Sequence, residues 1–566
     1  MTEQFSRRSA LKLLASGAGM VVLAACGSAA APTSSTPVAA PSSAPPKPSA
    51  AAAPASASAA PIASASSAPV ASVSSAAKPS AAPSGQPKTG GTIRFGATAD
   101  IPNLDGHQRS ATLTDTTWTA FDRLIQYDDK GKPQPMLAES WDLAPDDKSV
   151  TFHLRKGVTF HTGREFTSDD VKWNLLRGKD PKVGSGSYVT WANWVTSIDT
   201  PDKYTVALKF DNSRPSIFDW FEYYNMLDSV VMQGPDAQTK LSGTGPFVFQ
   251  EWKQGTSISF TKNKNYWDTG KPYIDGHITS IVQANAGIAQ LEAGAIDMIK
   301  TESVDDIVRL KKDPKYQAIS HPFSGSFYEF GINATKPPYD NKLVRQALNF
   351  AINRDRFAST LMQGLAKPLT LFWSSTSPAY DDAKNKAVPF DLAKAKSLLQ
   401  QAGVTNLEAD LLYIPGSYPI LTPFAEIYQA DLAQIGVKLN IKAMETAPWL
   451  VQVNGLQYNG LYVSGDGLGN YQPATPLGAS PAWSPVKNNS GFKTDQWSQL
   501  VDAAGIETDP AKQKTLYGQI NDYMIDQAWS IVFAERLVLW LARVGIKNVN
   551  PTGRSSFIWS QAWIDS

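Results

Sequence analysis

Residues 27–88 form a low-complexity segment that consists almost wholly of Ala, Ser and Pro, with three lysines and neither an acidic nor an aromatic residue. All 16 tryptophans of the chain, by contrast, lie from Trp118 onward. A segment of this composition cannot bury enough apolar surface to offset the entropy of ordering its backbone. We therefore expect a disordered tether over 27–88, and at about 5–6 Å × √n its average reach is roughly 45 Å. Any packed core lies in 89–566.

The first 26 residues have the pattern of an export signal. Arg7, Arg8 and Lys12 precede an uncharged run over 13–25, and small residues lead to Cys26. As a helix this run rises about 20 Å, which is short of the roughly 30 Å of a hydrocarbon core. The pattern predicts a cleaved signal peptide over 1–26 rather than a membrane span.

The residues around Cys26, the single cysteine, indicate lipidation. Leu23-Ala24-Ala25-Cys26 resembles the bacterial lipobox, and the resemblance implies that Cys26 is diacylated and becomes the N-terminus after cleavage. The alternative is a cysteine buried as a small hydrophobe. Residues 6–12 also resemble a twin-arginine export signal, although Ala10 stands where that pattern has a bulky apolar residue, so the export route stays open. We expect an extracytoplasmic protein anchored to the cell membrane, in a periplasm or on a cell surface.

The charge and motif content of 89–566 excludes several classes of function. Removing the six basic residues and one acidic residue of 1–88 from the totals of 52 and 51 leaves 46 and 50, a net charge of −4. This balance gives no basic footprint for nucleic acid or for anionic lipid. One cysteine excludes a disulfide framework and cysteine-based metal sites, and the five histidines are dispersed without an H-E-x-x-H pair. Neither a G-x-S-x-G elbow nor a P-loop occurs. We therefore predict no catalysis, no cofactor and no bound metal ion.

The first part of residues 89–566 is predicted to be rich in β-strands. Apolar residues alternate with polar ones over 150–154 and again over 204–210, as in half-buried strands. Between them, Thr167 is a candidate N-cap with Asp169 and Asp170 in the first helical turn, where carboxylates meet the positive end of the helix dipole. Gly178 is expected to end this helix.

Farther along the chain, the pattern becomes that of an α/β region. Residues 411–414 read as a buried strand, Thr422-Pro423 opens an amphipathic helix that Gly436 ends, and residues 437–441 alternate as the next strand. A strand, a helix and a strand at this spacing predict a βαβ unit with a right-handed crossover. Asp340 is expected to cap one long helix that ends at Gly364.

Three blocks of residues resemble the signature of one known family, the extracellular solute-binding proteins of the oligopeptide, dipeptide and nickel importer type (family 5). The blocks occur in the family's order and extend over nearly the whole body. They are Leu137-Ala138-Glu139-Ser140-Trp141 with 151–158 and 166–171, then Gly243-Thr244-Gly245-Pro246-Phe247 with Asn265-Tyr266-Trp267, and finally Lys336-Pro337-Pro338-Tyr339 with Val344-Arg345-Gln346-Ala347-Leu348.

The resemblance implies an α/β fold like that of type II periplasmic binding proteins, in which two lobes close on a ligand about a hinge and a smaller subdomain is inserted in lobe one. We expect lobe one over 89–330 with the inserted subdomain at about 116–240, lobe two over 331–528, and a return to lobe one over 529–566. A body of this length also exceeds what one hydrophobic core usually supports.

The resemblance further implies a binding protein rather than an enzyme. Such a protein captures a small peptide, a peptide-like solute or an amine, and delivers it to the permease subunits of an ATP-driven (ABC) importer. We expect a monomer whose partners are the solute, the permease and, through the lipid anchor, the membrane. Two alternatives stay open: a tethered sensor or adhesion module with the same fold, and a family member that binds an oligosaccharide or a metal chelate.

Asp466 is the first candidate ligand-binding residue, because it falls where the resemblance places the acidic residue that pairs with the α-ammonium group of a peptide. A partly buried carboxylate suits a cationic amine, since the pair offsets a desolvation cost that neither charge bears alone. The alternative is a solvated turn residue in Gly465-Asp466-Gly467. No arginine lies between Trp449 and Asp466 to bind a ligand carboxylate, which favours amines or oligosaccharides over free peptides.

The remaining candidates are aromatic residues and one charged pair. Trp449, Tyr462 and Tyr471 offer flat faces to a sugar ring or a side chain, with core packing as the alternative use. Tyr328 and Glu535-Arg536 are expected beside the crossings between the lobes. Within a strand, Glu535 and Arg536 would point to opposite faces, one of them toward the cleft. An exposed sheet edge is the alternative.

Overall fold

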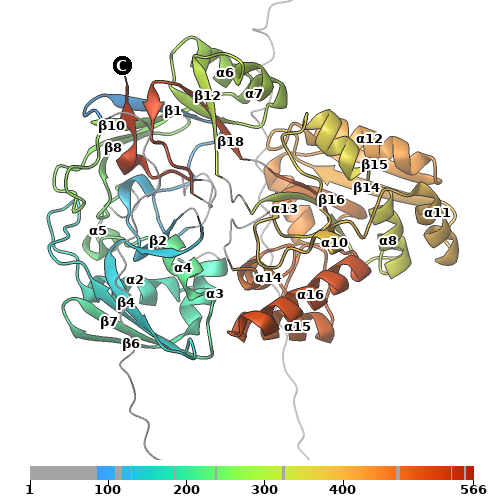
Figure 1. Cartoon of the computed structure of the whole chain (residues 1–566), viewed down its shortest axis with the longest axis horizontal. Coiled ribbons are helices and arrows are strands. Elements are labelled where there is room, and N and C mark those ends of the chain that lie inside the picture. The colour runs from blue at the N-terminus through green and yellow to red at the C-terminus, as the bar shows by residue number, and fades with distance from the viewer. Residues whose placement is uncertain are drawn as a thin grey trace, which may run out of the picture. The chain divides into compact units, whose positions relative to one another are not determined.

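The computed structural model describes residues 86–108, 118–128, 130–183, 186–235, 237, 239–321, 325–466, 472–536, 538–552 and 556–565, and Figure 1 shows their arrangement. The predicted signal peptide, Cys26 and the tether up to residue 85 lie outside the described residues. Within the unit Pro79–Ser566, the described strands form three main sheets.

Lobe one is the part built on a seven-stranded sheet with the order β12-β18-β11-β1-β10-β9-β8. β1 runs parallel to β10 and β11, whereas β18 pairs with β11 and β12 in antiparallel register. The bounds are β1 (Thr92–Ala97), β8 (Phe247–Lys253), β9 (Ser257–Lys262), β10 (Gly276–Ile281), α6 (Ala284–Glu292), β11 (Met298–Thr301), α7 (Val304–Leu310), β12 (Tyr316–Ser320), β18 (Leu539–Arg543), β19 (Ile546–Lys547), η2 (Trp559–Gln561) and β20 (Trp563–Ile564). Lobe one therefore combines residues from both ends of the described chain.

A subdomain on a four-stranded antiparallel sheet, β4-β5-β7-β6, is inserted between β1 and β8. Both strands expected from alternation are present, and Val150, Phe152 and Leu154 are buried in its core. The helix expected after Thr167 is confirmed, with a capping box between Thr167 and Asp170. The bounds are β2 (Ile125–Tyr127), β3 (Pro133–Pro135), β4 (Ala138–Leu143), β5 (Ser149–Leu154), α2 (Ser168–Gly178), α3 (Gly186–Trp194), β6 (Val195–Asp202), β7 (Thr205–Phe210), α4 (Ile217–Tyr223) and α5 (Ser229–Gln233).

Lobe two is the part built on a five-stranded sheet with the order β15-β14-β16-β13-β17. The predicted βαβ unit is confirmed: β14 and β15 are parallel, α12 connects them, and Gly436 ends the connection with a φ of +81°. The bounds are β13 (Phe327–Ile332), α8 (Lys342–Phe350), α9 (Arg354–Arg356), η1 (Phe357–Leu361), α10 (Asp382–Asn385), α11 (Leu392–Gln401), β14 (Leu407–Tyr413), α12 (Leu421–Ala433), β15 (Val437–Ala443), α13 (Thr446–Asn454), β16 (Gly460–Asp466), α14 (Ala474–Ala479), α15 (Asp495–Ile506), α16 (Pro510–Gln527) and β17 (Ser530–Glu535).

The prediction of one long helix from Asp340 to Gly364 is wrong. The N-cap is Asn341, whose side chain accepts a hydrogen bond from the Leu343 backbone N–H at 2.9 Å, and α8 ends at Phe350. The chain then bends before α9 and the π-helical turn η1. The bend brings the buried Arg354 to the backbone carbonyls of Leu369 and Val532, at 2.9 Å each. These tertiary hydrogen bonds outweigh the local preference for an unbroken helix.

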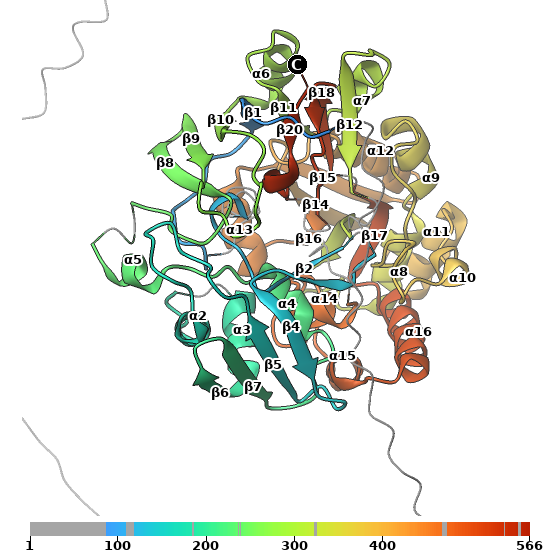
Figure 2. The same ribbon diagram turned by 60° about the vertical axis from the view of Figure 1, so that its left-hand side comes forward.

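The chain passes between lobe one and lobe two at two crossings. β13 and β17 both belong to the five-stranded sheet, whose strands therefore lie within 327–535. The lobe bounds expected from the sequence stay predictions. Figure 2 shows β17 and β18, the strands on either side of the second crossing. Among the described residues, no helix combines the length and apolar character needed to cross a bilayer.

Candidate solute-binding site

The carboxyl ends of four strands of lobe two lie along one edge of the five-stranded sheet. β14, β15, β16 and β17 all run in one direction, and β13 alone runs against them. At this edge the backbone register pairs Phe327, the first residue of β13, with Asp466 on one side and Glu535 on the other. In open α/β sheets, ligands bind at the carboxyl ends of the strands. This edge, which also adjoins both crossings, is the candidate site.

Arg536 forms a partly buried ionic cluster on one side of the crossing. Its guanidinium donates hydrogen bonds to the Glu302 carboxylate of lobe one, the longer of them from Nε at 3.1 Å. The Tyr328 hydroxyl donates to the other oxygen of Glu302 at 3.3 Å, and the Tyr418 ring lies 5.0 Å from the guanidinium carbon. Burial alone would lower the pKa of Arg536, but the facing carboxylate raises it above its ordinary value. Arg536 is therefore charged and neutralised within the protein.

Glu535, the neighbouring residue, lies in a different environment. Only 8% of Glu535 is exposed. In the sheet its backbone lies opposite Phe327, not opposite Tyr328, which belongs to the cluster around Arg536. Its backbone N–H donates to the Lys367 carbonyl at 2.9 Å. Burial raises the pKa of Glu535, an effect that the charge of Lys367 opposes. Glu535 and Arg536 thus contact different surroundings, as expected for neighbours with alternating side chains.

Trp449 and Tyr462 take part in a small core cluster with Tyr458. The two rings are nearly perpendicular at a centroid distance of 5.7 Å, and both residues are buried. The Tyr462 ring lies over Gly331, where a Cβ atom would come within 2.1 Å of it, so glycine is required there. The Tyr462 hydroxyl donates to Glu329 at 3.4 Å. These contacts are those of packing residues, and a role in ligand binding stays a prediction.

Two of the predicted site residues are described incompletely or not at all. Asp466 is the last residue of strand β16, and its side chain lies outside the described structure, so its role as a ligand-binding residue or as a turn residue stays a prediction. Tyr471 and Gly467 lie outside the described residues.

A direct contact, which no sequence pattern predicted, joins the subdomain to lobe two. Asp219 of α4 is fully buried, and its two carboxylate oxygens accept hydrogen bonds from the Tyr127 hydroxyl at 2.9 Å and from the Thr475 hydroxyl of α14 at 2.6 Å. Ala479, also on α14, packs against the core of the subdomain. Because 256 residues separate Asp219 from Thr475, no local pattern links them.

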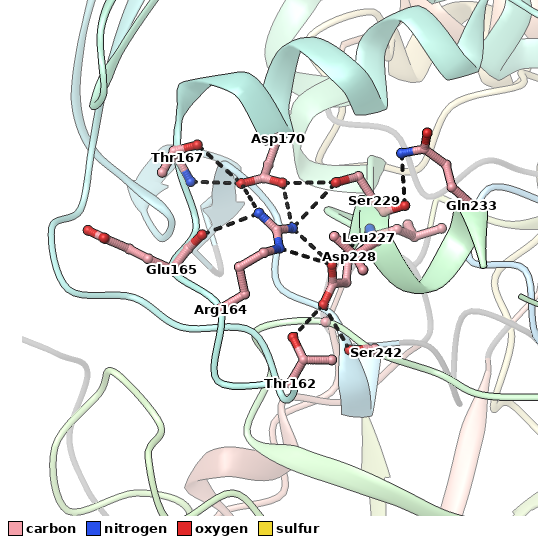
Figure 3. Close-up of polar contacts among 12 residues, drawn as sticks. Thr162, Arg164, Glu165, Thr167, Asp170, Leu227, Asp228, Ser229, Gln233 and Ser242 are labelled. Carbon is pink, nitrogen blue, oxygen red and sulfur yellow. Dashed lines mark hydrogen bonds and ion pairs between the residues drawn. The ribbon is translucent and has the colours of Figure 1, made fainter. Parts of the chain in front are cut away.

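Asp170, in the first turn of α2, serves the fold of the subdomain (Figure 3). The Arg164 guanidinium donates to Asp170 at 2.6 Å and to Asp228 at 2.8 Å, and both carboxylates are buried. Asp170 caps α2 and Asp228 caps α5, so one arginine joins two helix N-termini. Within the described ranges, no three His, Cys, Asp or Glu side chains gather as a metal ion would need.

Comparison with known proteins identifies the family. Residues 132–480, more than half of the chain, match the family model of the bacterial extracellular solute-binding proteins, family 5. The chain belongs to this family. Among similar proteins, heme-binding protein A of Haemophilus influenzae is 31% identical over 444 residues, covering 72% of this chain and 80% of the relative. Di/tripeptide-binding protein 1 of Pseudomonas aeruginosa is 30% identical, covering 78% and 88%.

Solved structures agree on the fold of this solute-binding protein. The periplasmic binding protein AgaA from A. tumefaciens R10, in complex with agropinic acid, superposes with a TM-score of 0.75 at 25% identity and covers 84% of this chain and 99% of its own. The binding protein DppA of Helicobacter pylori, in complex with the peptide STSA, gives a TM-score of 0.75 at 24% identity, with 85% and 99% covered. The predicted α/β fold of the periplasmic-binding-protein type is confirmed.

Proposed function

We propose that this family 5 protein captures a small peptide, or a peptide-like amine, outside the cytoplasm and delivers it to the permease of an ABC importer. The observation that carries the proposal is the edge of lobe two, where Asp466 and Glu535 flank Phe327 in register beside both crossings. Two of the similar proteins support the same class of solute, since one is named a di/tripeptide-binding protein and the other holds a peptide, whereas the remaining two are named for heme and agropinic acid.

Closure of the two lobes is the proposed readout of binding. A solute at this edge would lie between the five-stranded sheet and lobe one, and the contact of Asp219 with Thr475 joins lobe two to the subdomain. A closed state becomes populated only to the extent that the solute binds it better than the open state. Tyr328 and Arg536, held by Glu302 at the crossing, are proposed to position the site rather than to contact the solute.

The proposal is tested by ligand-dependent thermal stabilisation. The chain from Pro79 onward, titrated with a panel of di- and tripeptides, should gain RT ln(1 + [L]/Kd) of stability, or about 2.7 kcal/mol at a hundredfold excess over Kd. Native mass spectrometry of the purified protein would identify a solute that is retained from the cell. A panel without any shift, together with a ligand-free mass, would contradict the proposal. A metal chelate or an oligosaccharide that shifts the melting temperature instead would reassign the solute within the family.

We further propose that the protein is a lipoprotein anchored through Cys26, on the basis of the charged, apolar and small-residue pattern of 1–26. Cys26→Ser should remove the acyl chains and release the protein into the periplasm or the medium. Recovery of the Cys26→Ser protein in the membrane fraction at the wild-type level would contradict the anchor. A strain that lacks the protein but takes up every solute normally, while a response to solutes changes, would favour a sensor.

A further inference from the structure

Glu535 and Arg536 are adjacent in sequence, yet among the described residues only Arg536 has an ion-pair partner. Arg536 is paired with Glu302 and covered by the Tyr418 ring. The Glu535 carboxylate, by contrast, has no hydrogen-bond or ion-pair partner among the described residues, although the residue is only 8% exposed. Among the described residues, the carboxylate at the second crossing is therefore left without a direct partner.

Lys367 is bonded to Glu535 through the backbone, but it is not an ion-pair partner of the Glu535 carboxylate. Its backbone carbonyl accepts the Glu535 N–H, but its own side chain is exposed and its ammonium group donates to the Ser375 hydroxyl at 3.3 Å. The ammonium group of Lys367 acts on Glu535 at a distance and does not form an ion pair with it.

An unpaired carboxylate in this position has a cost. A buried charge without a partner is destabilising, and burial correspondingly raises the pKa of Glu535. A glutamine at the same position would carry no charge to desolvate. Side chains that lower the stability of the folded protein in this way are concentrated at functional sites.

Glu535 lies where the proposed function puts the solute. It is the last residue of β17, at the carboxyl edge where the proposed function puts the solute, and the register sets it across Phe327 from Asp466. We propose that Glu535 binds a positively charged group of the solute, an ammonium or a guanidinium, and so makes the protein selective for cationic solutes. The inference rests on the proposed function and narrows its solute class.

The test compares matched peptides on the full-length chain in detergent micelles. Ala-Lys-Ala and its neutral counterpart Ala-norleucine-Ala, each with a free and an acetylated N-terminus, are titrated by isothermal calorimetry. We expect wild type to prefer the form with the additional cation by about ten- to hundredfold, the range of a hydrogen bond to a charged group. Glu535→Gln should reduce that preference to within about threefold and leave the affinity for the acetylated norleucine peptide unchanged.

The pattern of loss identifies the cation. Loss of the lysine preference assigns Glu535 to a side-chain cation of the solute, and loss of the preference for the free N-terminus assigns it to the α-ammonium group. Full retention of both preferences in Glu535→Gln, or an equal loss for charged and neutral peptides, would overturn the inference. Glu408→Gln, at an exposed acidic residue of β14 that pairs with Lys438, is the matched control and should leave all four affinities unchanged.

A ligand-free measurement separates this inference from the proposed function. If wild type binds none of the peptides, the proposal of a peptide solute fails. The melting temperatures of ligand-free wild type and ligand-free Glu535→Gln then test the role of Glu535. A higher melting temperature for Glu535→Gln supports a carboxylate retained for a cationic partner. A lower one shows that Glu535 serves the fold, and overturns the inference.

Discussion

Thr475→Val removes one hydrogen bond between the subdomain and lobe two, and so tests the contribution of that contact to solute binding. The Thr475 hydroxyl donates to Asp219 at 2.6 Å, and both residues are buried. Valine keeps the shape of threonine and removes the donor, so the Asp219 carboxylate loses one hydrogen bond while Tyr127 still donates to it. Loss of one partner by a buried charged group costs about 1–3 kcal/mol. In an open state, water would solvate Asp219 and the cost would vanish.

The expected consequence is a uniform loss of affinity. If every solute is bound in the state with this contact, Thr475→Val raises each Kd by the same factor, about 5- to 150-fold at 1.4 kcal/mol per factor of ten. Calorimetry with a cationic and a neutral solute measures both factors, and small-angle scattering measures the radius of gyration without and with solute.

The control and the refuting results follow from the geometry. Thr515→Val, on an exposed position of α16 where the hydroxyl donates to the Ala511 carbonyl at 3.0 Å, should change neither affinity. Wild-type affinities in Thr475→Val would show that the contact does not contribute to closure. A loss confined to one solute would place Thr475 in the binding site itself, and would equally refute the reasoning.

Two further predictions concern stability. Burial lowers the pKa of His277 to about 3, and neither ring nitrogen has a hydrogen-bond partner among the described residues. This histidine should therefore contribute roughly 2–3 kcal/mol to the stability that wild type loses from pH 7 to pH 4.5, because the unfolded histidine takes up a proton below its ordinary pKa of 6.5 and the folded one does not. His277→Phe should lose that much less in urea unfolding at the two pH values, and equal losses would contradict the assignment. Arg164→Met should cost about 3 kcal/mol, the low end for breaking a buried ion pair because the arginine is partly exposed. Lys386→Met, in an exposed pair with Asp382, is its control at no more than about 0.5 kcal/mol, and comparable values for the two would show that the Arg164 contacts are dispensable.

Local sequence patterns predicted the parts of the fold that local forces decide. Alternation located β5 and β7, and a cap followed by an acidic first turn located α2. The βαβ unit over 407–443 followed from helix-breaking and strand-forming residues at the right spacing. The break after α8 could not be predicted this way, because it depends on hydrogen bonds from Arg354 to Val532, 178 residues away.

The candidate site was predictable in place more than in detail. Proximity to the crossings and the family resemblance led to Asp466, Tyr328, Glu535 and Arg536, and the register places their strands together. The sequence could not show that Arg536 is neutralised by Glu302, since the two residues are 234 positions apart. Nor could it show that Trp449 packs on Tyr462, because an aromatic residue in a core and one in a pocket look alike in a single sequence.

The ion pair of Arg536 with Glu302 has a mechanical consequence. Arg536 follows β17 at the second connection between the lobes, and Glu302 also accepts a hydrogen bond from Tyr328, which lies just after the first connection. Atoms near an axis of rotation move least when two bodies turn about it. If the lobes turn about these connections, as the proposed function requires, we expect this ion pair to be retained and the contact of Asp219 with Thr475 to break. Substitution of Arg536 or Glu302 would then change the direction of lobe closure. Substitution of Asp219 or Thr475 would change the equilibrium between the open and the closed state.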